Sequence, residues 1–344
     1  MKKRPKRSRQ AIVASDTADW VQTRPLLADC KIPLLIEPKM EGVDLCAWAE
    51  GNKPMVDQLL AQHHALLFRG FEFQKPGAVE RFDRFVDLTA SGERLHYKDR
   101  STPRNTHGDR IYDATVYPAE QTIALHNEGT YWTAWARKLY FACAQNATTG
   151  GQTPIADTHA IYQRIDPAIR AEFEARDILY VRNFNSGFGL DWQTVFQTED
   201  TQEAEAYCKA NQIEFEWKDG GRMRTRQRRP AVRMHPESGL PLWFNHGAFF
   251  HVSSLDPAMR DLFLAELGEA ELPYNTYYGD GASIDPEVIA HLRQAYLDEK
   301  VVFRWQDGDI ALYDNMRVAH AREPYTGDRT TLVAMTEAYS APAP

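Results

Sequence analysis

The stretch 122–132, TIALHNEGTYW, determines how we interpret the rest of the chain. Its apolar start ends in His126, an acidic residue, Glu128, follows two positions later, and two aromatic residues close the run. On a β-strand, residues i and i+2 point to the same side of the sheet. We therefore predict a strand over 122–126 whose end directs an imidazole and a carboxylate at one metal ion.

The same spacing of a histidine and an acid occurs twice more, at His107/Asp109 and at His235/Glu237. A chain with 11 histidines and 48 acidic residues is expected to contain such pairs by chance. The polar segment 101–110 predicts a loop around the first pair, and HPESG (235–239) predicts the tip of a hairpin. Only the pair at 126 and 128 has a strand to orient it and aromatic residues beside it.

A third ligand for this site is predicted in YDNMRVAHARE (313–323), where His320 follows a strand. Two histidines and one carboxylate hold the metal in non-haem Fe(II) oxygenases and leave positions open for a cosubstrate and oxygen. His126, Glu128 and His320 together make such a set.

Many short apolar runs bounded by turn residues predict a chain rich in β-strands. We expect strands over 33–38, 64–71, 122–126, 138–145, 178–184, 241–246, 301–305, 309–314 and 330–339. We expect helices over 54–62 and 78–89, and helix starts at Asp166-Pro167 and Asp285-Pro286. No glycine-rich nucleotide-binding motif is present. This pattern favours a mainly β, α+β fold with a jelly-roll core, flanking helices and insertions.

The length of 344 residues corresponds to about two domains at about 150 residues each. The sequence contains no internal repeat and no low-complexity linker, so we expect a single domain over 11–344 after a disordered basic tail over 1–10. Six of the 40 basic side chains lie in that tail, which leaves 34 against 48 acidic ones, a net charge of −14.

This composition also excludes several classes of function. An acidic body argues against binding of nucleic acid. No apolar run reaches the length of a membrane span, and no signal peptide follows the basic start, so we expect a cytoplasmic protein. The four cysteines are far apart, which predicts neither a disulfide framework nor a cysteine-based zinc site.

Four motifs taken together resemble the TauD/TfdA family of Fe(II)- and 2-oxoglutarate-dependent dioxygenases: His126-x-Glu128, GGQTP (150–154), DNMRVAHAR (314–322) and GDRTTLVAM (327–335). Further stretches, among them HNEGTYW, RTRQRRPA and HPESGLPLWFNH, are similar to the SyrP-like branch. That branch includes amino-acid hydroxylases of peptide-synthetase pathways. The resemblance implies a cupin-like double-stranded β-helix that uses Fe(II), 2-oxoglutarate and O2.

The resemblance also implies roles for individual residues. His126, Glu128 and His320 match the iron ligands, with glutamate where taurine dioxygenase itself has aspartate. Arg329 matches the arginine that binds the far carboxylate of 2-oxoglutarate, and Thr153 matches the threonine that assists it. Arginine suits this task because its planar fork pairs with a carboxylate through two hydrogen bonds. Val333 stands where taurine dioxygenase has a substrate-binding arginine, which disfavours a sulfonate substrate.

A run of arginines over 221–230, GRMRTRQRRP, has alternating members at 222, 224, 226 and 228. On a strand these side chains would share one face. That face is either a solvated, salt-bridged surface or an anion site for a substrate carboxylate, a phosphopantetheine arm or an acidic carrier protein. Candidate substrate contacts are Arg224, Arg226, Asn245 and His246, with His251 close by.

We therefore expect an oxygenase that hydroxylates an unactivated C–H bond of an amino acid, either free or tethered to a peptidyl carrier protein. Desaturation on the same iron, a non-catalytic jelly-roll binding protein and a zinc hydrolase are the alternatives. The last two give no role to Arg329. The sequence makes no prediction about the oligomeric state.

Overall fold

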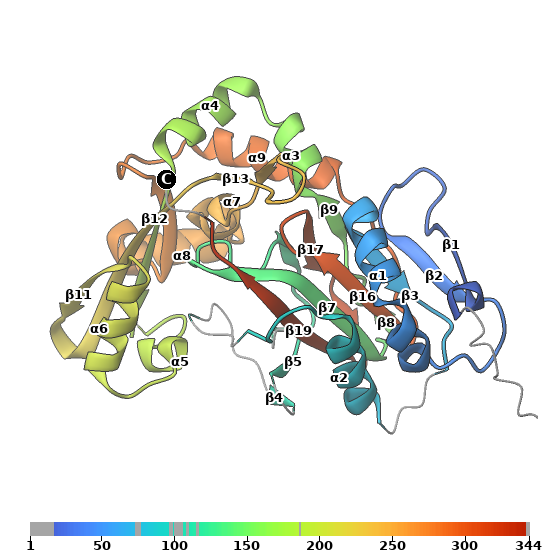
Figure 1. Ribbon diagram of the computed structural model, residues 1–344. Helices are drawn as coiled ribbons and strands as arrows, with labels where there is room; N and C mark the ends of the chain where they lie inside the picture. Colours follow the sequence, from blue (N-terminus) through green and yellow to red (C-terminus); the bar gives the residue numbers. More distant parts are fainter. Residues whose placement is uncertain are drawn as a thin grey trace, which may run out of the picture.

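The computed structural model describes residues 17–72, 77–95, 99, 106–107, 110–114, 117–185 and 187–341 (Figure 1). The basic tail, Asp109 and the side chain of His107 lie outside the described residues. The chain folds into a mixed α+β structure with one large sheet and four smaller ones. Within the described residues, no helix has both the length and the apolar character needed to cross a membrane.

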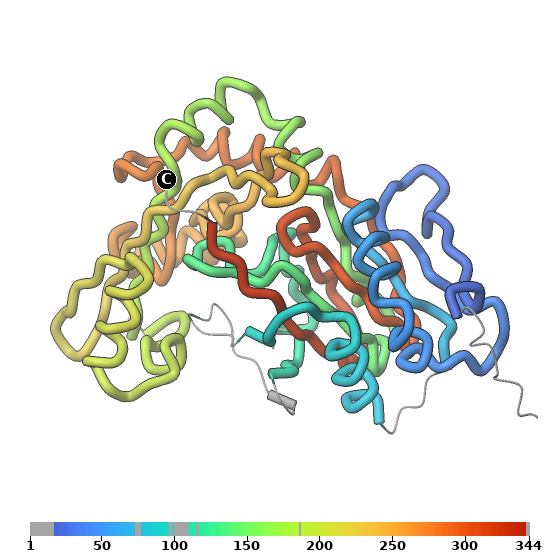
Figure 2. Tube along the Cα trace, viewed as in Figure 1, coloured from blue at the N-terminus to red at the C-terminus, as the bar shows by residue number. Residues whose placement is uncertain are grey.

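The large sheet has eight strands in the order β1-β2-β3-β16-β7-β19-β5-β4. In chain order its strands are β1 (Val21–Pro25), β2 (Leu34–Pro38), β3 (Ala65–Phe68), β4 (Thr106–His107), β5 (Ile111–Asp113), β7 (Trp135–Gln145), β16 (Ile310–Asp314) and β19 (Thr330–Tyr339). All neighbours pair antiparallel except β2 and β3, which are parallel. Figure 2 shows the C-terminal strands, in red, running beside the green segment that holds β7.

A three-stranded sheet, β6-β17-β9, comprises β6 (Ile123–His126), β9 (Ile155–Asp157) and β17 (Val318–Arg322). The two-residue strand β8 (Thr149–Gly150), which precedes β9 in the sequence, pairs with β18 (Tyr325–Thr326), which follows β17. Successive segments therefore alternate between the sheets, because β5, β7, β16 and β19 lie in the large sheet while β6, β9 and β17 lie in the small one.

Both faces of the central strands β3, β16 and β7 are buried, as their nearly continuous apolar sequences require, whereas the edge strand β1 is mostly exposed. Leu66, Tyr140 and Leu312 pack against α1 (Leu45–His63) and α2 (Ala78–Thr89). Their neighbours Phe141 and Tyr313 point to the opposite face, where they join the core that includes the three-stranded sheet. The period-2 alternation of strands thus divides the apolar side chains between two cores.

The remaining elements form the other end of the molecule. A four-stranded sheet, β11-β12-β10-β15, comprises β10 (Ile178–Phe184), β11 (Glu214–Lys218), β12 (Arg222–Arg229) and β15 (Tyr274–Tyr278), and β13 (Val232–Met234) pairs with β14 (Pro241–Trp243) as a hairpin. Helices in this half are α3 (Thr158–Arg164), α4 (Pro167–Arg176), α5 (Trp192–Phe196), α6 (Thr201–Ala210), α7 (Gly247–Phe250), α8 (Pro257–Leu267) and α9 (Pro286–Asp298). In Figure 1, α5 and α6 lie beside β11 and β12 at the left edge.

Most predicted elements are confirmed. The helix over 78–89 and the strands over 178–184 and 330–339 have the predicted bounds. Asp166 and Asp285 cap α4 and α9 with proline at the first turn, and Asp256 does the same for α8. All four cysteines are free thiols.

The predicted strand over 301–305 is wrong. Val301 forms only an isolated bridge to Ile155, and no ladder continues beyond it. Phe303 and Trp305 are buried while the intervening Arg304 is exposed, so the segment alternates as a strand would. The alternation reports which side chains are buried, whereas a strand also needs a neighbouring backbone with which to pair.

Candidate metal centre and cosubstrate pocket

Strand pairing brings together two histidines that are far apart in the sequence. His126, the last residue of β6, lies directly opposite His320 in the antiparallel pairing of β6 with β17. Residues opposite each other in neighbouring strands project from the same face, and the two imidazole rings lie with their centroids 4.5 Å apart. The register of two strands, rather than local sequence, thus brings two of the three candidate ligands together.

Glu128 completes the cluster. Its Oε1 lies 3.7 Å from His320 Nε2 and 4.0 Å from His126 Nε2. One ligand atom from each of the three residues lies within 4.8 Å of the other two, and Glu128 and His320 are 5% and 6% exposed. Two imidazole nitrogens and one carboxylate oxygen converging in a dry site form a donor set that fits Fe(II).

The orientation of His126 also suits a metal ligand. Its Nδ1 lies 2.8 Å from the carbonyl oxygen of Ala124. A carbonyl only accepts hydrogen bonds, so Nδ1 carries the proton and Nε2 presents its lone pair toward Glu128. A hydrogen bond of this kind fixes the tautomer and ring orientation of metal-binding histidines. The ring of His320 packs against Phe141, with centroids 5.0 Å apart.

A cavity of about 430 Å³, including the open space at its mouth, adjoins these three residues. Its lining combines the three residues with apolar, hydroxyl and guanidinium groups, namely Ala114, Ile123, Phe141, Thr153, Ala321, Arg322, Arg329 and Thr331. The structure therefore places the predicted cosubstrate residues, Thr153 and Arg329, in the same cavity as the predicted metal ligands.

Arg329 is half-buried in this cavity, and burial is the main reason that its pKa is lowered. Among the described residues it forms no ion pair with an acidic side chain, although its guanidinium lies 5.5 Å from the centre of the Tyr325 ring. Gly151 makes room for it, because a Cβ at that position would lie 3.3 Å from Cδ and Nε of Arg329. A half-buried cation without an acidic partner is suited to bind an anionic ligand.

Thr153 is 4% exposed, and its Oγ1 accepts a hydrogen bond of 2.7 Å from Nε1 of Trp305. This bond fixes the position of the hydroxyl oxygen and leaves its own hydrogen available for donation.

Arg322 is a residue of this cavity that the sequence analysis did not assign. It follows His320 by two positions on β17, and its guanidinium donates to the carbonyl oxygens of three residues, Tyr117, Pro118 and Gln121. The segment that leads into β6 is thus fastened to the strand that carries His320. The i, i+2 spacing from His320 is the signal that could have identified it.

His246 is the only predicted substrate contact that lies beside the three clustered residues in the described part of the chain. Its ring centroid lies 5.7 Å from that of His126, and its Nδ1 hydrogen-bonds with the hydroxyl of Thr130. Burial lowers the pKa of His246 well below its usual value, so the ring is neutral. The rings of Phe249 and Tyr131, 5.2 and 5.3 Å from His246, complete an aromatic wall.

Asn245 and His251 have local partners instead. The side chain of Asn245 donates to Ala231 O and accepts from the Gly247 N–H, and His251 Nδ1 bonds with the Ser253 hydroxyl. These contacts stabilise the chain around α7. Their part in substrate binding stays a prediction.

The alternating arginines share one face of β12, as predicted, and this face is salt-bridged. Arg224 bonds to Asn183 Oδ1, at 2.8 Å, and to Glu271 Oε1, at 2.7 Å. Arg226 lies 3.6 Å from Glu216. Neither arginine lines the cavity beside His126, so the structure does not place them against a carboxylate bound in that cavity.

The hairpin predicted at 235–239 is confirmed between β13 and β14, and His235 and Glu237 have different partners, in agreement with the interpretation that they are not a ligand pair. His235 is 4% exposed, and its Nε2 lies 2.8 Å from Oδ2 of Asp314. Glu237 instead accepts from Arg137 at the surface. The tertiary fold supplies a different acid, 79 positions away, to the same histidine.

A comparison with protein families matches residues 23–336 to the model of the taurine catabolism dioxygenase TauD, TfdA family. This chain belongs to the TauD/TfdA family. It is an Fe(II)- and 2-oxoglutarate-dependent dioxygenase, as the resemblance of its motifs predicted.

Relatives of this TauD/TfdA dioxygenase include a dapdiamide synthesis protein, DdaC, from Enterobacter agglomerans. DdaC is 40% identical over 282 residues, which are 82% of this chain and 84% of DdaC. A clavaminate synthase-like protein from Arabidopsis thaliana is 28% identical over 83% of this chain and 84% of its own length. The PvcB protein of Pseudomonas aeruginosa has a similar fold, with a TM-score of 0.55 at 18% identity, over 92% of this chain and 91% of PvcB.

Proposed function

We propose that this dioxygenase hydroxylates an unactivated C–H bond of an amino acid within a biosynthetic pathway. The observation that carries the proposal is the convergence of two imidazoles and one carboxylate beside a cavity that also holds Arg329. The biosynthetic setting follows from the relative that acts in dapdiamide synthesis. The amino-acid substrate follows from the SyrP-like motifs.

In this proposal, His126 and His320 bind Fe(II) through Nε2, and Glu128 binds it through its carboxylate. Bound Fe(II) would activate O2, which is the oxidant: one oxygen atom would enter the substrate, and the other would enter succinate as 2-oxoglutarate is oxidised and loses CO2. Arg329 binds the distal carboxylate of 2-oxoglutarate, and the Thr153 hydroxyl donates to the same group. His246 and the aromatic rings around it exclude water and bound the space for the substrate on the other side of His126.

The same proposal accounts for the architecture. We interpret the large sheet and the three-stranded sheet as the two faces of a double-stranded β-helix, because consecutive strands alternate between them. The metal ligands then lie at the mouth between the sheets, on β6, β17 and the turn after β6. We propose that the described residues form one domain around this core; residues 11–16, where the predicted domain begins, lie outside the described residues.

The decisive experiment measures succinate formation and product mass with Fe(II), 2-oxoglutarate and a panel of amino acids, each offered free and as a carrier-protein thioester. A substrate-dependent mass gain of one oxygen supports hydroxylation, whereas a loss of two hydrogens indicates desaturation. His320→Ala is the control for background oxidation. Absence of succinate with every substrate, in enzyme that binds Fe(II), would reject the proposal.

We infer that the amino acid is presented by a carrier protein, because the β12 arginines outnumber the acids with which they pair: Arg222 and Arg224 share Glu271, which leaves a cationic excess on an otherwise acidic body. Arg228, which pairs with Asp177, is the most exposed of these paired arginines, with 55% of its side chain exposed. Arg228→Glu should slow turnover of a carrier-bound amino acid, and added salt should reduce the difference from the wild type. Arg84→Glu, on the distant helix α2 and 61% exposed, is the matched control. Equal turnover of the free and carrier-bound forms would contradict the inference.

A further inference from the structure

The end of β16 and the turn that follows it contain two buried polar residues for which the proposed chemistry has no use. Asp314 and Asn315 are 6% and 0% exposed, and neither lines the cavity beside the metal ligands. Buried polar groups are costly unless they are hydrogen-bonded, so a set of them at one turn calls for an explanation.

Strand pairing positions two of the three metal ligands but not the third. His126 and His320 are opposite each other in the β6–β17 ladder. Glu128 lies two residues beyond the end of β6, in a turn, and no strand register determines its place. Another contact must therefore hold its backbone.

Asn315 provides that contact. Its Oδ1 accepts from the N–H of Glu128 at 2.9 Å, and its Nδ2 donates to the carbonyl oxygen of Glu128 at 2.9 Å. A single side chain therefore holds both backbone polar groups of the residue that carries the carboxylate. The same Nδ2 also donates to Ala136 O at 2.9 Å, which ties the turn to the start of β7.

The backbone of Asn315 is held as well. Its N–H donates to Arg137 O at 2.8 Å, and its carbonyl oxygen accepts from Asn127 Nδ2 at 2.7 Å. Asn127 directly precedes Glu128, so the two asparagines clamp the Glu128 segment reciprocally. With the backbone fixed on both sides, only the side-chain torsions of Glu128 remain free.

We propose that Asn315 is a positioning residue that aims the Glu128 carboxylate at the same point as the two imidazoles. The proposal rests on the assignment of Glu128 as a metal ligand. It adds a residue whose effect on the metal is exerted entirely through the backbone of that ligand.

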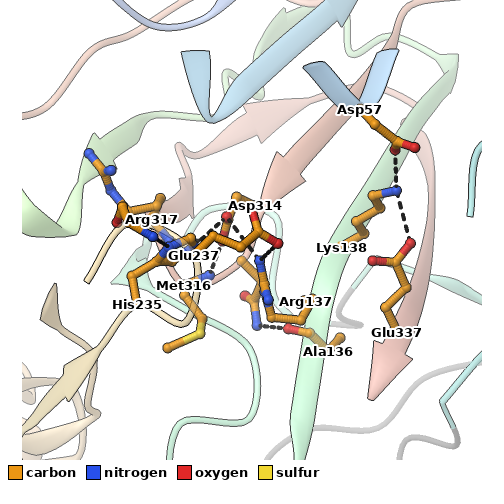
Figure 3. Close-up of polar contacts among 12 residues, drawn as sticks. Asp57, Ala136, Arg137, Lys138, His235, Glu237, Asp314, Met316, Arg317 and Glu337 are labelled. Carbon is orange, nitrogen blue, oxygen red and sulfur yellow. Dashed lines mark hydrogen bonds and ion pairs between the residues drawn. The ribbon is translucent and has the colours of Figure 1, made fainter. Parts of the chain in front are cut away.

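Asp314 and His235 hold Asn315 in place. Asp314 Oδ1 accepts from the N–H groups of Met316 and Arg317, at 2.9 and 3.3 Å, which closes the turn around Asn315. Its Oδ2 accepts from His235 Nε2 at 2.8 Å. Figure 3 shows Asp314 between His235 and the guanidinium of Arg137.

The tautomer of His235 fits this role. Its Nδ1 accepts from the Ser238 N–H at 3.1 Å, so the proton is on Nε2 and points at Asp314. The β13–β14 hairpin is thereby connected to the turn that positions Glu128.

The test uses Asn315→Asp, which keeps the size of the side chain but places an acceptor where Nδ2 donated to Glu128 O and Ala136 O. We expect the affinity for Mn(II), measured by calorimetry without substrate or 2-oxoglutarate, to fall about 10- to 100-fold, as is typical when a group that orients a metal ligand is removed. Asn315→Ser, which retains a small hydrogen-bonding group, should have a smaller effect and serves if Asn315→Asp does not fold.

Asn275→Asp is the matched control. Asn275 is 3% exposed, its Oδ1 accepts from the Val252 N–H at 2.9 Å, and its Nδ2 donates to the Tyr277 hydroxyl at 3.1 Å. Asn275→Asp should lower the melting temperature, as the Asn315 variants do, but it should leave the affinity for Mn(II) unchanged. An equal loss of Mn(II) affinity in both aspartate variants would overturn the proposal.

Glu128→Ala separates this proposal from the one on which it rests. If Glu128→Ala binds Mn(II) as the wild type does, the assignment of the ligand is wrong and both proposals fail. If Glu128→Ala loses Mn(II) but the Asn315 variants keep it, only the positioning role is refuted.

Discussion

Replacement of Arg329 by alanine should remove most of the affinity for 2-oxoglutarate. The arginine is half-buried, lines the cavity beside the three proposed metal ligands, and has no acidic partner among the described residues. A carboxylate that enters this cavity gains two charge-assisted hydrogen bonds from one guanidinium, each worth about 1.5–3 kcal/mol.

Two such bonds amount to about 3–6 kcal/mol, and about 1.4 kcal/mol corresponds to a tenfold change in affinity. Water can enter the space that the alanine variant opens and solvate the carboxylate, so the lower end of this range applies. We expect a loss of affinity of about 100-fold, and of at least tenfold. Arg329→Lys should recover only part of it, because an ammonium cannot pair with both carboxylate oxygens in the same plane.

The assay is calorimetric titration of the Mn(II)-loaded enzyme with 2-oxoglutarate and with 2-oxopentanoate, which has the same chain length but no distal carboxylate. The wild type should prefer 2-oxoglutarate strongly, and Arg329→Ala should lose that preference while it binds 2-oxopentanoate as well as before. Arg84→Ala, which removes an exposed charge, is the control. An undiminished preference for 2-oxoglutarate in Arg329→Ala would refute the assignment.

Three further predictions concern the metal, the backbone and the pH dependence. His320→Ala should abolish Mn(II) binding in calorimetry, whereas His107→Ala should retain it; binding by the first variant would reject the ligand set. Gly150→Ala should prevent folding or lower the melting temperature sharply, because φ is +70° and the new Cβ would lie 2.0 Å from a backbone carbonyl oxygen. Gly220→Ala is the control, because φ is similar, at +74°, but the space is open, and it should cost only about 1–2 kcal/mol of stability. An equal loss of stability in the two variants would contradict this explanation. Burial is the main cause that lowers the pKa of His64 from 6.5 to about 4. Between these values the unfolded chain binds a proton that the folded chain does not, so stability falls as the pH falls. His64→Asn, which tolerates the φ of 61°, should reduce that fall in urea unfolding, and an unchanged pH dependence would count against the explanation.

Much of the candidate site could be predicted from local sequence. The apolar run that ends at His126 predicted the strand that carries this histidine, and the two-residue spacing identified Glu128 as its neighbour, although Glu128 lies in the turn after β6 and not on the strand. The paired glycines at 150 and 151 belong to a motif that the sequence analysis quoted, and the structure explains them: both have positive φ, and a Cβ at either position would crowd a neighbouring segment. Periodicity and spacing depend on short stretches of backbone, so strands and neighbouring side chains can be predicted from them without knowledge of the fold.

The partners of the buried polar residues could not be predicted in this way. The sequence named no partner for His235, which is bound by Asp314 from a different sheet. The β12 arginines alternated as predicted, yet their acidic partners lie on β11, on the segment after α8 and after α4. An arginine face looks the same in sequence whether or not acids lie opposite it.

The sequence by itself determined the family, the strand that ends at His126 and the residue types of the candidate metal site, because these are expressed in contiguous motifs. Only the tertiary structure decided which strands are neighbours, and with them the pairing of His126 with His320 and the clamp of Asn315 on Glu128. The first contact joins residues 194 positions apart in the sequence, and the second joins residues 187 positions apart. Such contacts depend on the register between strands, which no local pattern of hydrophobicity specifies.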